Sequence, residues 1–203
     1  MYKEILTDKQ IELFPLLKKF SKDFYFAGGT AVALHIGHRH SIDLDLFSGE
    51  EFENKDLVQK VKSINSIDKV VIDKAGEYTL ISQGVKITFL HYPYKVEHQE
   101  KLDDIIGLPD LITLAAMKAF TLGRRAKWKD YVDLYFVMEN YCGLRDIADK
   151  ANNIFDGEFN EKLFRVQLAY FEDVDYSEQV DYLSEYEVAD DVVKERLKEI
   201  STS

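Results

Sequence analysis

Two aspartates stand two residues apart in the stretch Ser41-Ile42-Asp43-Leu44-Asp45-Leu46-Phe47. If this stretch is a β-strand, alternate side chains share a face, so both carboxylates and Ser41 point away from the apolar core. Carboxylates roughly 7 Å apart at Cα, from a rise of about 3.3 Å per residue, repel each other unless a cation lies between them. Such hard oxygen ligands suit Mg²⁺, which completes its shell with water and substrate phosphate. The pattern predicts a magnesium site at Asp43 and Asp45; the alternative is a pair of solvated carboxylates on a surface strand.

A glycine pair, Gly28-Gly29, follows the aromatic and apolar segment from Phe24 to Ala27, which suits a buried strand. Glycine allows a sharp turn and lets a ligand approach the backbone closely. Thr30 is predicted to cap a short helix from Ala31 to Ile36. Because backbone N–H groups at a helix N-terminus bind phosphate, Gly28, Gly29 and Thr30 are candidate phosphate ligands; the alternative is an ordinary turn and cap.

Two side chains near the aspartates could also contact phosphate. The guanidinium of Arg39 matches phosphate geometry, the alternative being a loop arginine at the surface. Ser41 could bind phosphate or hold Asp43 in place. The neighbouring imidazoles are interpreted as structural, because magnesium chemistry does not need them: His35, His38 and His40.

A second group of charged residues lies further along the chain. Lys118 interrupts an apolar helical run, and Arg125 follows seven residues later on the same face. In Lys129-Asp130-Tyr131-Val132-Asp133, the two aspartates stand at i and i+3 on one face of a following helix. Taken alone, these residues predict two helices joined by salt bridges.

Together the two groups resemble a known family. Gly28-Gly29-Thr30 followed by Gly37-His38-Arg39-His40-Ser41-Ile42-Asp43-Leu44-Asp45-Leu46-Phe47 resembles motif I of the DNA polymerase beta-type nucleotidyltransferases. More narrowly, the chain resembles the AbiEii/AbiGii-type toxins of abortive-infection and type IV toxin–antitoxin systems, which carry a lysine on one helix and Lys/Arg-Asp-x-x-Asp on the next. The resemblance implies that Lys118 contacts nucleotide phosphates and that Asp130 is needed for transfer or orients the lysine, with Arg125 in support.

The resemblance also implies the reaction: Mg²⁺-dependent transfer of a nucleoside monophosphate from an NTP to an acceptor hydroxyl. A tRNA or another RNA end is the implied acceptor, and a cognate antitoxin is the implied protein partner. The following basic residues form a candidate RNA contact or line the triphosphate site: Lys118, Arg124, Arg125, Lys127 and Lys129.

One position departs from the family pattern. Superfamily members commonly add a third carboxylate on a neighbouring strand, where this chain has Thr88; Asp73 and Glu77 are the candidate substitutes. The departure keeps open a catalytically degenerate fold that binds nucleotide or a partner protein. A relative of aminoglycoside nucleotidyltransferases, acting on a cationic small molecule, is a third hypothesis because the chain is acidic.

The composition excludes several other classes. The 203 residues carry a net charge of −11, which opposes non-specific binding to nucleic acid. Cys142 is the single cysteine, so neither an internal disulfide nor a cysteine-based zinc site is expected. The N-terminus has no signal-peptide pattern, and no apolar run reaches about 18 residues, so we expect a cytoplasmic protein with no membrane partner.

The elements that position these residues predict an α+β fold: a nucleotidyltransferase-type mixed β-sheet flanked by helices, followed by a helical C-terminal part. The predicted division is residues 1–108, the nucleotidyltransferase core, and 109–203, which completes the active-site cleft. Strands are expected at Lys69 to Asp73, Tyr78 to Ser82 and Val85 to Tyr92, extending the sheet that carries Asp43 and Asp45. Helices are expected at Thr7 to Lys19 with a kink at Pro15, Glu50 to Ile64, Asp110 to Arg125 with Pro109 opening it, Trp128 to Tyr141, Leu144 to Phe155, Glu161 to Phe171 and Asp190 to Ile200. Lys95 to Asp104 is expected to be a linker or surface loop, and Asp173 to Glu187 has no assignment.

Overall fold

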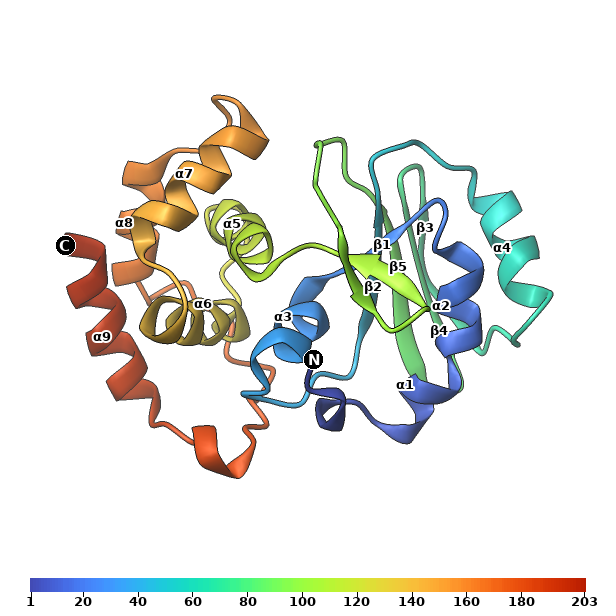
Figure 1. Ribbon diagram of the computed structural model, residues 1–203, viewed down its shortest axis with the longest axis horizontal. Helices are drawn as coiled ribbons and strands as arrows, with labels where there is room; N and C mark the ends of the chain where they lie inside the picture. Colours follow the sequence, from blue (N-terminus) through green and yellow to red (C-terminus); the bar gives the residue numbers. More distant parts are fainter.

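A five-stranded mixed sheet occupies the middle of the N-terminal part of the chain (Figure 1). The computed structural model describes residues 1–203. In spatial order the strands are β1 (Tyr25–Ala27), β2 (Leu44–Ser48), β5 (Val85–His91), β4 (Glu77–Ser82) and β3 (Lys69–Lys74). Only the β2–β5 pair is parallel. The prediction that the later strands extend the sheet carrying Asp45 is confirmed.

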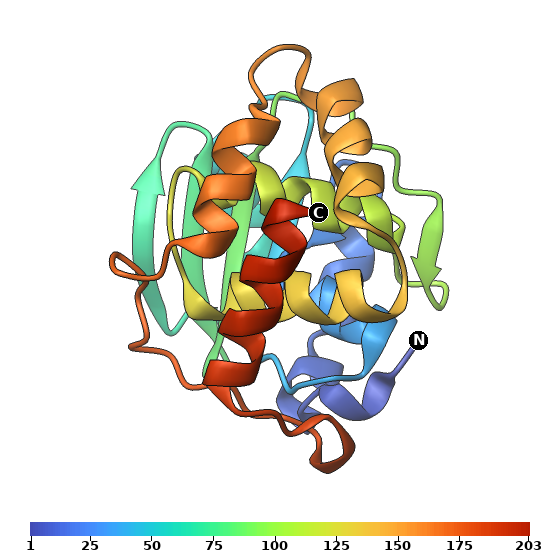
Figure 2. The same cartoon turned by 90° about the vertical axis from the view of Figure 1, so that its left-hand side faces the viewer.

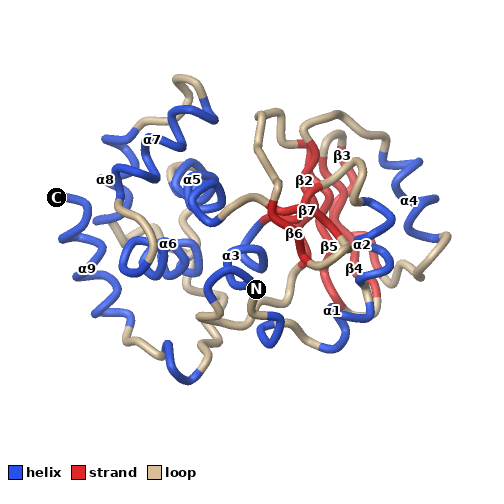
Figure 3. The backbone as a smooth tube through the Cα atoms, viewed as in Figure 1, coloured by secondary structure: helices blue, strands red, loops and turns tan.

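Strands β2 and β5 alternate between a buried face and a partly exposed face. Leu44, Leu46, Ile87 and Phe89 are fully buried. Three helices cover this buried face: α1 (Asp8–Glu12), α2 (Phe14–Phe20) and α4 (Asn54–Lys62) (Figure 3). The opposite face, which carries Asp45, turns toward the helical part of the molecule.

The N-terminal helix is broken where proline predicts a break. Thr7 caps α1, its hydroxyl accepting a hydrogen bond from the Gln10 N–H, and the chain restarts as α2 at Phe14. Pro15 is the second residue of α2, where its missing N–H costs nothing because the first turn has no helical acceptor for it.

Several expected boundaries are wrong; the helix expected from Glu50, for example, begins at Asn54. Helix α3 (Gly28–Ile36) begins at Gly28 and not after Thr30, because Gly28 turns directly into the helix at φ +72°. Strand β2 begins at Leu44, so Ser41 and Asp43 lie in the preceding loop. The expected linker contains part of a hairpin of β6 (Glu100–Leu102) and β7 (Ile106–Leu108).

The C-terminal part contains helices and no strand longer than an isolated bridge. Its elements are α5 (Leu111–Leu122), α6 (Trp128–Asn140), α7 (Leu144–Phe155), α8 (Glu161–Ala169), the 3-10 turn η2 (Ser184–Tyr186) and α9 (Asp190–Thr202). Asp110 caps α5 by accepting a hydrogen bond from the Thr113 N–H at 2.8 Å, so Pro109 precedes the helix instead of opening it. Figure 2 shows α9 crossing in front of α6, and an ion pair between Arg196 and Glu139 (2.6 Å) joins the two helices.

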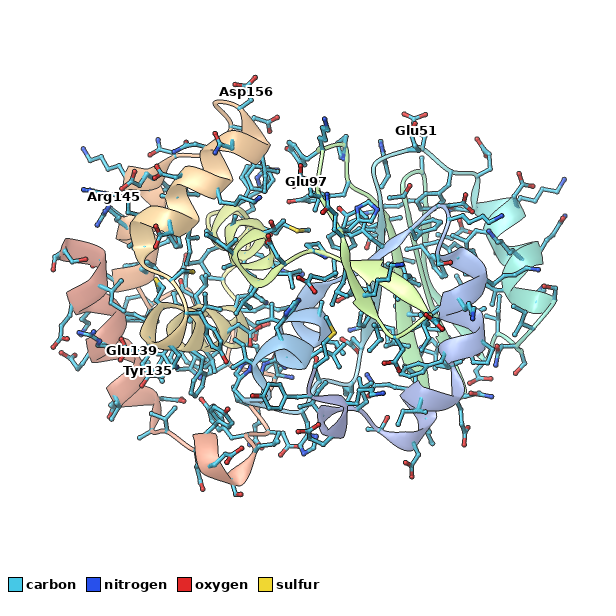
Figure 4. The ribbon with its side chains drawn as sticks, in the orientation of Figure 1. Glu51, Glu97, Tyr135, Glu139, Arg145 and Asp156 are labelled. Carbon is cyan, nitrogen blue, oxygen red and sulfur yellow. The ribbon has the colours of Figure 1, made fainter.

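One continuous core of 53 buried apolar residues runs through the sheet and the helical part. Tyr94 helps to join them: its hydroxyl donates a hydrogen bond to Glu158 at 2.9 Å, and its ring packs edge-on against Phe155. Figure 4 shows Glu97, on the same loop as Tyr94, between the sheet and the helices, whereas Arg145 and Asp156 project from the periphery.

The domain boundary after residue 108 stays a prediction. None of the helices has both the length and the apolar character that crossing a lipid bilayer requires.

Candidate active site

The carboxylate of Asp45 lies directly against the backbone of Gly28. A Cβ atom added to Gly28 would stand only 2.1 Å from Asp45 Oδ2, so a side chain there would displace the carboxylate. The left-handed φ of +72° independently favours glycine at this position. Asp45 therefore sits beside the N-terminus of α3, where the helix dipole favours negative charge.

Asp43 precedes β2 and carries an ion pair that the sequence did not suggest. Lys86 Nζ on β5 lies 2.5 Å from Asp43 Oδ2. Although burial would lower it, the hydrogen bond and charge of Asp43 raise the pKa of Lys86. The ammonium is thus held beside Asp43, and its charge also acts on Asp45.

The ionised form of the Asp45 carboxylate is disfavoured in the folded protein. Burial and the charge of Asp43 raise the pKa of Asp45 to about 6, against the opposing charges of Lys86 and Arg125. A cation bound beside Asp45 would favour the ionised form of its carboxylate.

Thr88 stands opposite Asp45 in the parallel pairing of β2 and β5. This register puts Thr88 in the neighbouring-strand position where a third carboxylate was expected. The two candidate substitutes are engaged elsewhere: Glu77 pairs with Lys74 at 2.8 Å, and Asp73 accepts a hydrogen bond from Asn54 at 2.7 Å. No cluster of three or more potential metal-ligating side chains of His, Cys, Asp or Glu is present.

Asp43 and Asp45 are the residues that could hold a divalent metal ion. Their oxygens are the hard ligands that Mg²⁺ prefers, and Lys86 already provides a positive charge at Asp43. The donor set fits one ion held by one or two carboxylates, with water and phosphate as the remaining ligands.

Lys118 joins the two aspartates of α6. Its Nζ lies 2.6 Å from Asp130 Oδ1 and 2.8 Å from Asp133 Oδ2. Burial alone would lower it, but the charges of Asp130 and Asp133 raise the pKa of Lys118, so the side chain stays an ammonium. The sequence expectation that the lysine and Asp130 act together agrees with this geometry, although their catalytic roles stay predictions.

Asp133 is the centre of the network. It accepts hydrogen bonds from Arg39 Nε (2.7 Å) and Arg39 Nη2 (2.9 Å), and its Oδ1 lies 2.7 Å from His38 Nε2. Burial would raise it, but the charges of Arg39 and Lys118 hold the pKa of Asp133 well below its usual range. The buried carboxylate is therefore ionised and fully paired.

Arg39 does not lie where a phosphate ligand was expected. Its side chain is 2% exposed and committed to Asp133 and to the carbonyl of His40. Gly29 makes room for it, since a Cβ atom there would stand 2.6 Å from Arg39 Nη2. The guanidinium can stabilise Asp133, but it presents no exposed surface to a ligand in this structure.

Thr30 and Ser41 are also turned inward. The Thr30 hydroxyl lies 2.5 Å from the Asp43 carbonyl and 2.8 Å from the Ser41 hydroxyl. The Ser41 carbonyl accepts a hydrogen bond from Gln10 at 2.8 Å. Of the two roles considered for Ser41, holding the loop that carries Asp43 agrees better with these contacts than binding phosphate. Thr30 belongs to the same support.

A cavity of about 160 Å³ separates the sheet from α5, and we call it the central cavity. The residues that line it include Gly28, Phe47, Leu90, Lys118, Arg125 and Asp130. Gly28, from the first group that the sequence singled out, therefore lines the same cavity as Lys118, Arg125 and Asp130 from the second. Asp130 Oδ2 is buried without a hydrogen-bond partner, with Arg125 Nε 3.6 Å away, so it could accept a hydrogen bond from a ligand.

The other basic residues of this region already have acidic partners. Lys127 and Lys129 both pair with Glu178, at 2.5 and 3.3 Å, and Arg124 pairs with Glu158 at 3.3 Å. The side chain of Arg125 is 61% exposed, and its ion pair with Asp130 is long, at 3.6 Å. Arg124, which is 58% exposed, and Arg125 are therefore the most exposed cations of the candidate RNA contact, and of the two only Arg125 lines the central cavity.

The molecule has a larger hollow, of about 910 Å³, near Phe24, Phe52 and Lys60. None of the predicted site residues lines it. Size alone therefore does not identify the site; the convergence of the charged groups does.

Sequence reasoning missed Lys86 and Glu178. It named Asp133 but did not identify its central position in the ion-pair network. The alternation of β5 puts Lys86 and Thr88 on one face, but only the register with β2 brings Lys86 to Asp43. Glu178 lies in the segment without an assignment, which pairs through Lys127–Asp175 and Arg39–Tyr182 bridges. Asp133 had a visible signal, its i, i+3 spacing from Asp130.

The fold is that of a nucleotidyltransferase, as solved structures show. MenT4, a nucleotidyltransferase toxin from Mycobacterium tuberculosis, superposes with a TM-score of 0.60 and 16% identity, over 95% of this chain and 81% of its own. JHP933 from Helicobacter pylori superposes with a TM-score of 0.57 and 17% identity, over 97% of this chain and 92% of its own. An uncharacterized protein of Aquifex aeolicus (strain VF5) is 27% identical over 182 residues, 87% of each chain.

The family follows from the sequence match. The model of the nucleotidyl transferase AbiEii toxin family, of the type IV toxin–antitoxin system, matches residues 15–191. This chain belongs to that family, and the resemblance drawn from its motifs is confirmed.

Proposed function

We propose that this protein is a Mg²⁺-dependent nucleotidyltransferase that transfers a nucleoside monophosphate from an NTP to an acceptor hydroxyl. The observation that carries the proposal is the convergence of Gly28, Lys118, Arg125 and Asp130 on the central cavity, with Asp45 against Gly28. A nucleoside triphosphate needs cations and backbone N–H donors around its phosphates. Lys118 and Arg125 provide the cations, and the backbone at Gly28 provides the donors.

The side chains divide the work. Asp43 and Asp45 would hold the magnesium ion. When bound, the ion would neutralise part of the negative charge of the phosphates. Arg125 and Lys118 bind phosphate oxygens from the helical side, and Asp130 orients the lysine through the 2.6 Å contact. The acceptor hydroxyl loses its proton to solvent as its oxygen forms a bond to the α-phosphorus. The bond between the α-phosphorus and the α,β-bridging oxygen breaks, and pyrophosphate leaves with that oxygen. Positioning and electrostatics provide most of the rate.

The acceptor we propose is an RNA end such as that of a tRNA, and the protein partner a cognate antitoxin. The family, a nucleotidyltransferase toxin of the type IV toxin–antitoxin system, supports the antitoxin partner, and the motif resemblance implies the RNA acceptor. Lys127 and Lys129 are paired with Glu178, so RNA binding would compete with that carboxylate for them.

Transfer of radiolabel tests the proposal. The protein is incubated with each α-labelled NTP, Mg²⁺ and total tRNA, beside Asp43→Asn/Asp45→Asn and a control, Asp73→Asn, which alters an exposed carboxylate on β3. We expect label on RNA with the wild type and Asp73→Asn and none with the double variant. Equal labelling by the double variant would overturn the assignment of the carboxylates.

A second candidate is a binding module without chemistry, and Thr88 is the observation in its favour. It predicts saturable NTP binding by the wild type and no transfer to any acceptor, whether tRNA, other RNA or a cationic small molecule. The same labelled nucleotides, in equilibrium dialysis, distinguish the two functions.

A further inference from the structure

Lys86 occupies the place at the aspartates that a cation would take. Its Nζ lies 2.5 Å from Asp43 Oδ2, and its charge also acts on Asp45. The side chain reaches this position from β5, where it shares a face with Thr88, the residue opposite Asp45. The lysine therefore stands next to the position where a third carboxylate is missing.

Both partners of the Lys86–Asp43 ion pair are partly exposed, so an ion from solution can replace the lysine at the carboxylate. Lys86 is 42% exposed and Asp43 is 30% exposed, unlike the buried pairs around Asp133. A lysine has a flexible four-carbon stem, so its ammonium can leave one oxygen and reach another without movement of the strand. No other basic side chain lies within 4 Å of Asp43 or Asp45.

A divalent ion and this ammonium cannot both use the same carboxylate oxygen. The ion carries twice the charge, so it competes for Asp43 and pushes the ammonium away from the carboxylates. A bound triphosphate would then offer the displaced ammonium another anionic partner. Glu178, whose charge also acts on Lys86, is already bound to Lys127 and Lys129.

We propose that Lys86 is an exchangeable counter-ion of the metal site: it neutralises Asp43 in the metal-free protein, a divalent ion displaces it, and the displaced ammonium binds the triphosphate. This inference rests on the proposed function, since it assumes that Asp43 and Asp45 hold a metal. It assigns to one lysine the charge that a second metal ion would otherwise contribute beside Thr88.

The proposal requires effects of opposite sign on two ligands. In Lys86→Gln the competitor for Asp43 is gone, so Mn²⁺ should bind about 3- to 10-fold more tightly by calorimetry or electron paramagnetic resonance. Inorganic tripolyphosphate, added with saturating Mn²⁺, should bind about 3- to 10-fold more weakly because a phosphate ligand is gone. These factors correspond to about 0.7 to 1.4 kcal/mol. A loss of folding would weaken both ligands and is therefore distinguishable.

Two variants control the measurement. Lys74→Gln removes a lysine from an ion pair with Glu77 on the outer strands of the same sheet and should change neither affinity. Lys86→Arg keeps the charge and should restore tripolyphosphate binding at least in part. Because coupling is reciprocal, Lys86→Gln should also lower the melting temperature of the metal-free protein more than that of the Mn²⁺-saturated protein.

The outcomes separate this inference from the proposed function. If the wild type binds neither Mn²⁺ nor tripolyphosphate, the proposed function fails. If the wild type binds both and Lys86→Gln leaves both affinities within twofold, or shifts them in the same direction, the metal site stands and the role of Lys86 is wrong.

Discussion

Arg39 and Asp133 are 94 residues apart in the chain, yet they form a buried ion pair with two contacts, at 2.7 and 2.9 Å. The pair joins the loop after α3 to the middle of α6. The same carboxylate lies 2.8 Å from Lys118 Nζ. The position of the lysine in the central cavity therefore depends on an arginine that belongs to the motif around the aspartates.

Asp133→Asn should destabilise the protein strongly. The substitution leaves Arg39 and Lys118 buried without their shared anion, and breaking a buried pair in this way costs about 3 to 5 kcal/mol. Urea denaturation followed by circular dichroism measures the loss. The matched control is Asp23→Asn, which removes an exposed partner of Lys60 and should cost at most about 1 kcal/mol. Equal losses in the two variants would contradict the central role of Asp133.

Asp45→Asn should stabilise the metal-free protein at neutral pH. Burial and Asp43 raise the pKa of Asp45 to about 6, so its ionised form is disfavoured in the folded state relative to the unfolded state. The wild type accordingly loses stability as the pH rises from about 4 through 6, whereas asparagine does not titrate. We expect the variant to gain about 1 to 3 kcal/mol at pH 7.5, at 1.36 kcal/mol per pKa unit, to keep roughly half of this gain at pH 5 and to lose most of it by about pH 4.

Thermal melting in EDTA at several pH values measures this difference, with Asp73→Asn as the control for an exposed carboxylate. Saturating Mg²⁺ should reverse the order, since the ion favours the ionised side chain. A gain that does not change with pH would show that charge is not its cause.

Much of the fold was predictable because its signals are local. The alternation of apolar residues in Val85–His91, the turn at Gln83-Gly84 and the proline that interrupts the first helix each act within a few residues. The boundary at Leu44 was not predictable in this way. A hydrogen bond from Thr30 to the Asp43 carbonyl ties that residue to α3, outside the strand ladder.

The candidate site was predictable only as two separate groups. Residue spacing indicated Asp43 with Asp45 and Lys118 with Asp130. That Gly28, which Asp45 contacts, lines the same cavity as Lys118 and Asp130 depends on how α5 packs over the sheet. The burial of Arg39 and the pairing of Lys86 with Asp43 are long-range contacts with no trace in local spacing. An arginine in a polar loop has the same local sequence whether it binds phosphate or a buried carboxylate.

Thr88→Asp should make the folded state depend on a divalent ion. A third carboxylate opposite Asp45 adds repulsion to a site that already disfavours ionisation, and we expect a loss of about 1 to 3 kcal/mol in EDTA. Mn²⁺ should recover this loss, because an ion that binds only the folded state stabilises it in proportion to its affinity. Thermal melting with and without Mn²⁺ measures the effect, and Thr88→Asn controls for the change of shape. If Mn²⁺ stabilises the aspartate and asparagine variants equally, Thr88 does not face the metal site.

Arg125→Gln should weaken substrate binding without weakening the fold. The side chain is 61% exposed, and its one ion-pair contact, to Asp130, is long at 3.6 Å, so the free energy of unfolding should change by less than about 0.5 kcal/mol. Loss of a charged contact to phosphate should raise the KM for NTP about tenfold, at roughly 1.4 kcal/mol, with a smaller change in kcat. Arg145→Gln, on the outward face of α7 in Figure 4, is the control and should leave KM unchanged.

Lys118→Met provides the contrast: it should lower kcat and also destabilise the protein, because it leaves Asp130 buried without its partner. A KM for Arg125→Gln equal to that of the wild type would remove Arg125 from the nucleotide site and leave Lys118 as its only cation from the helical part.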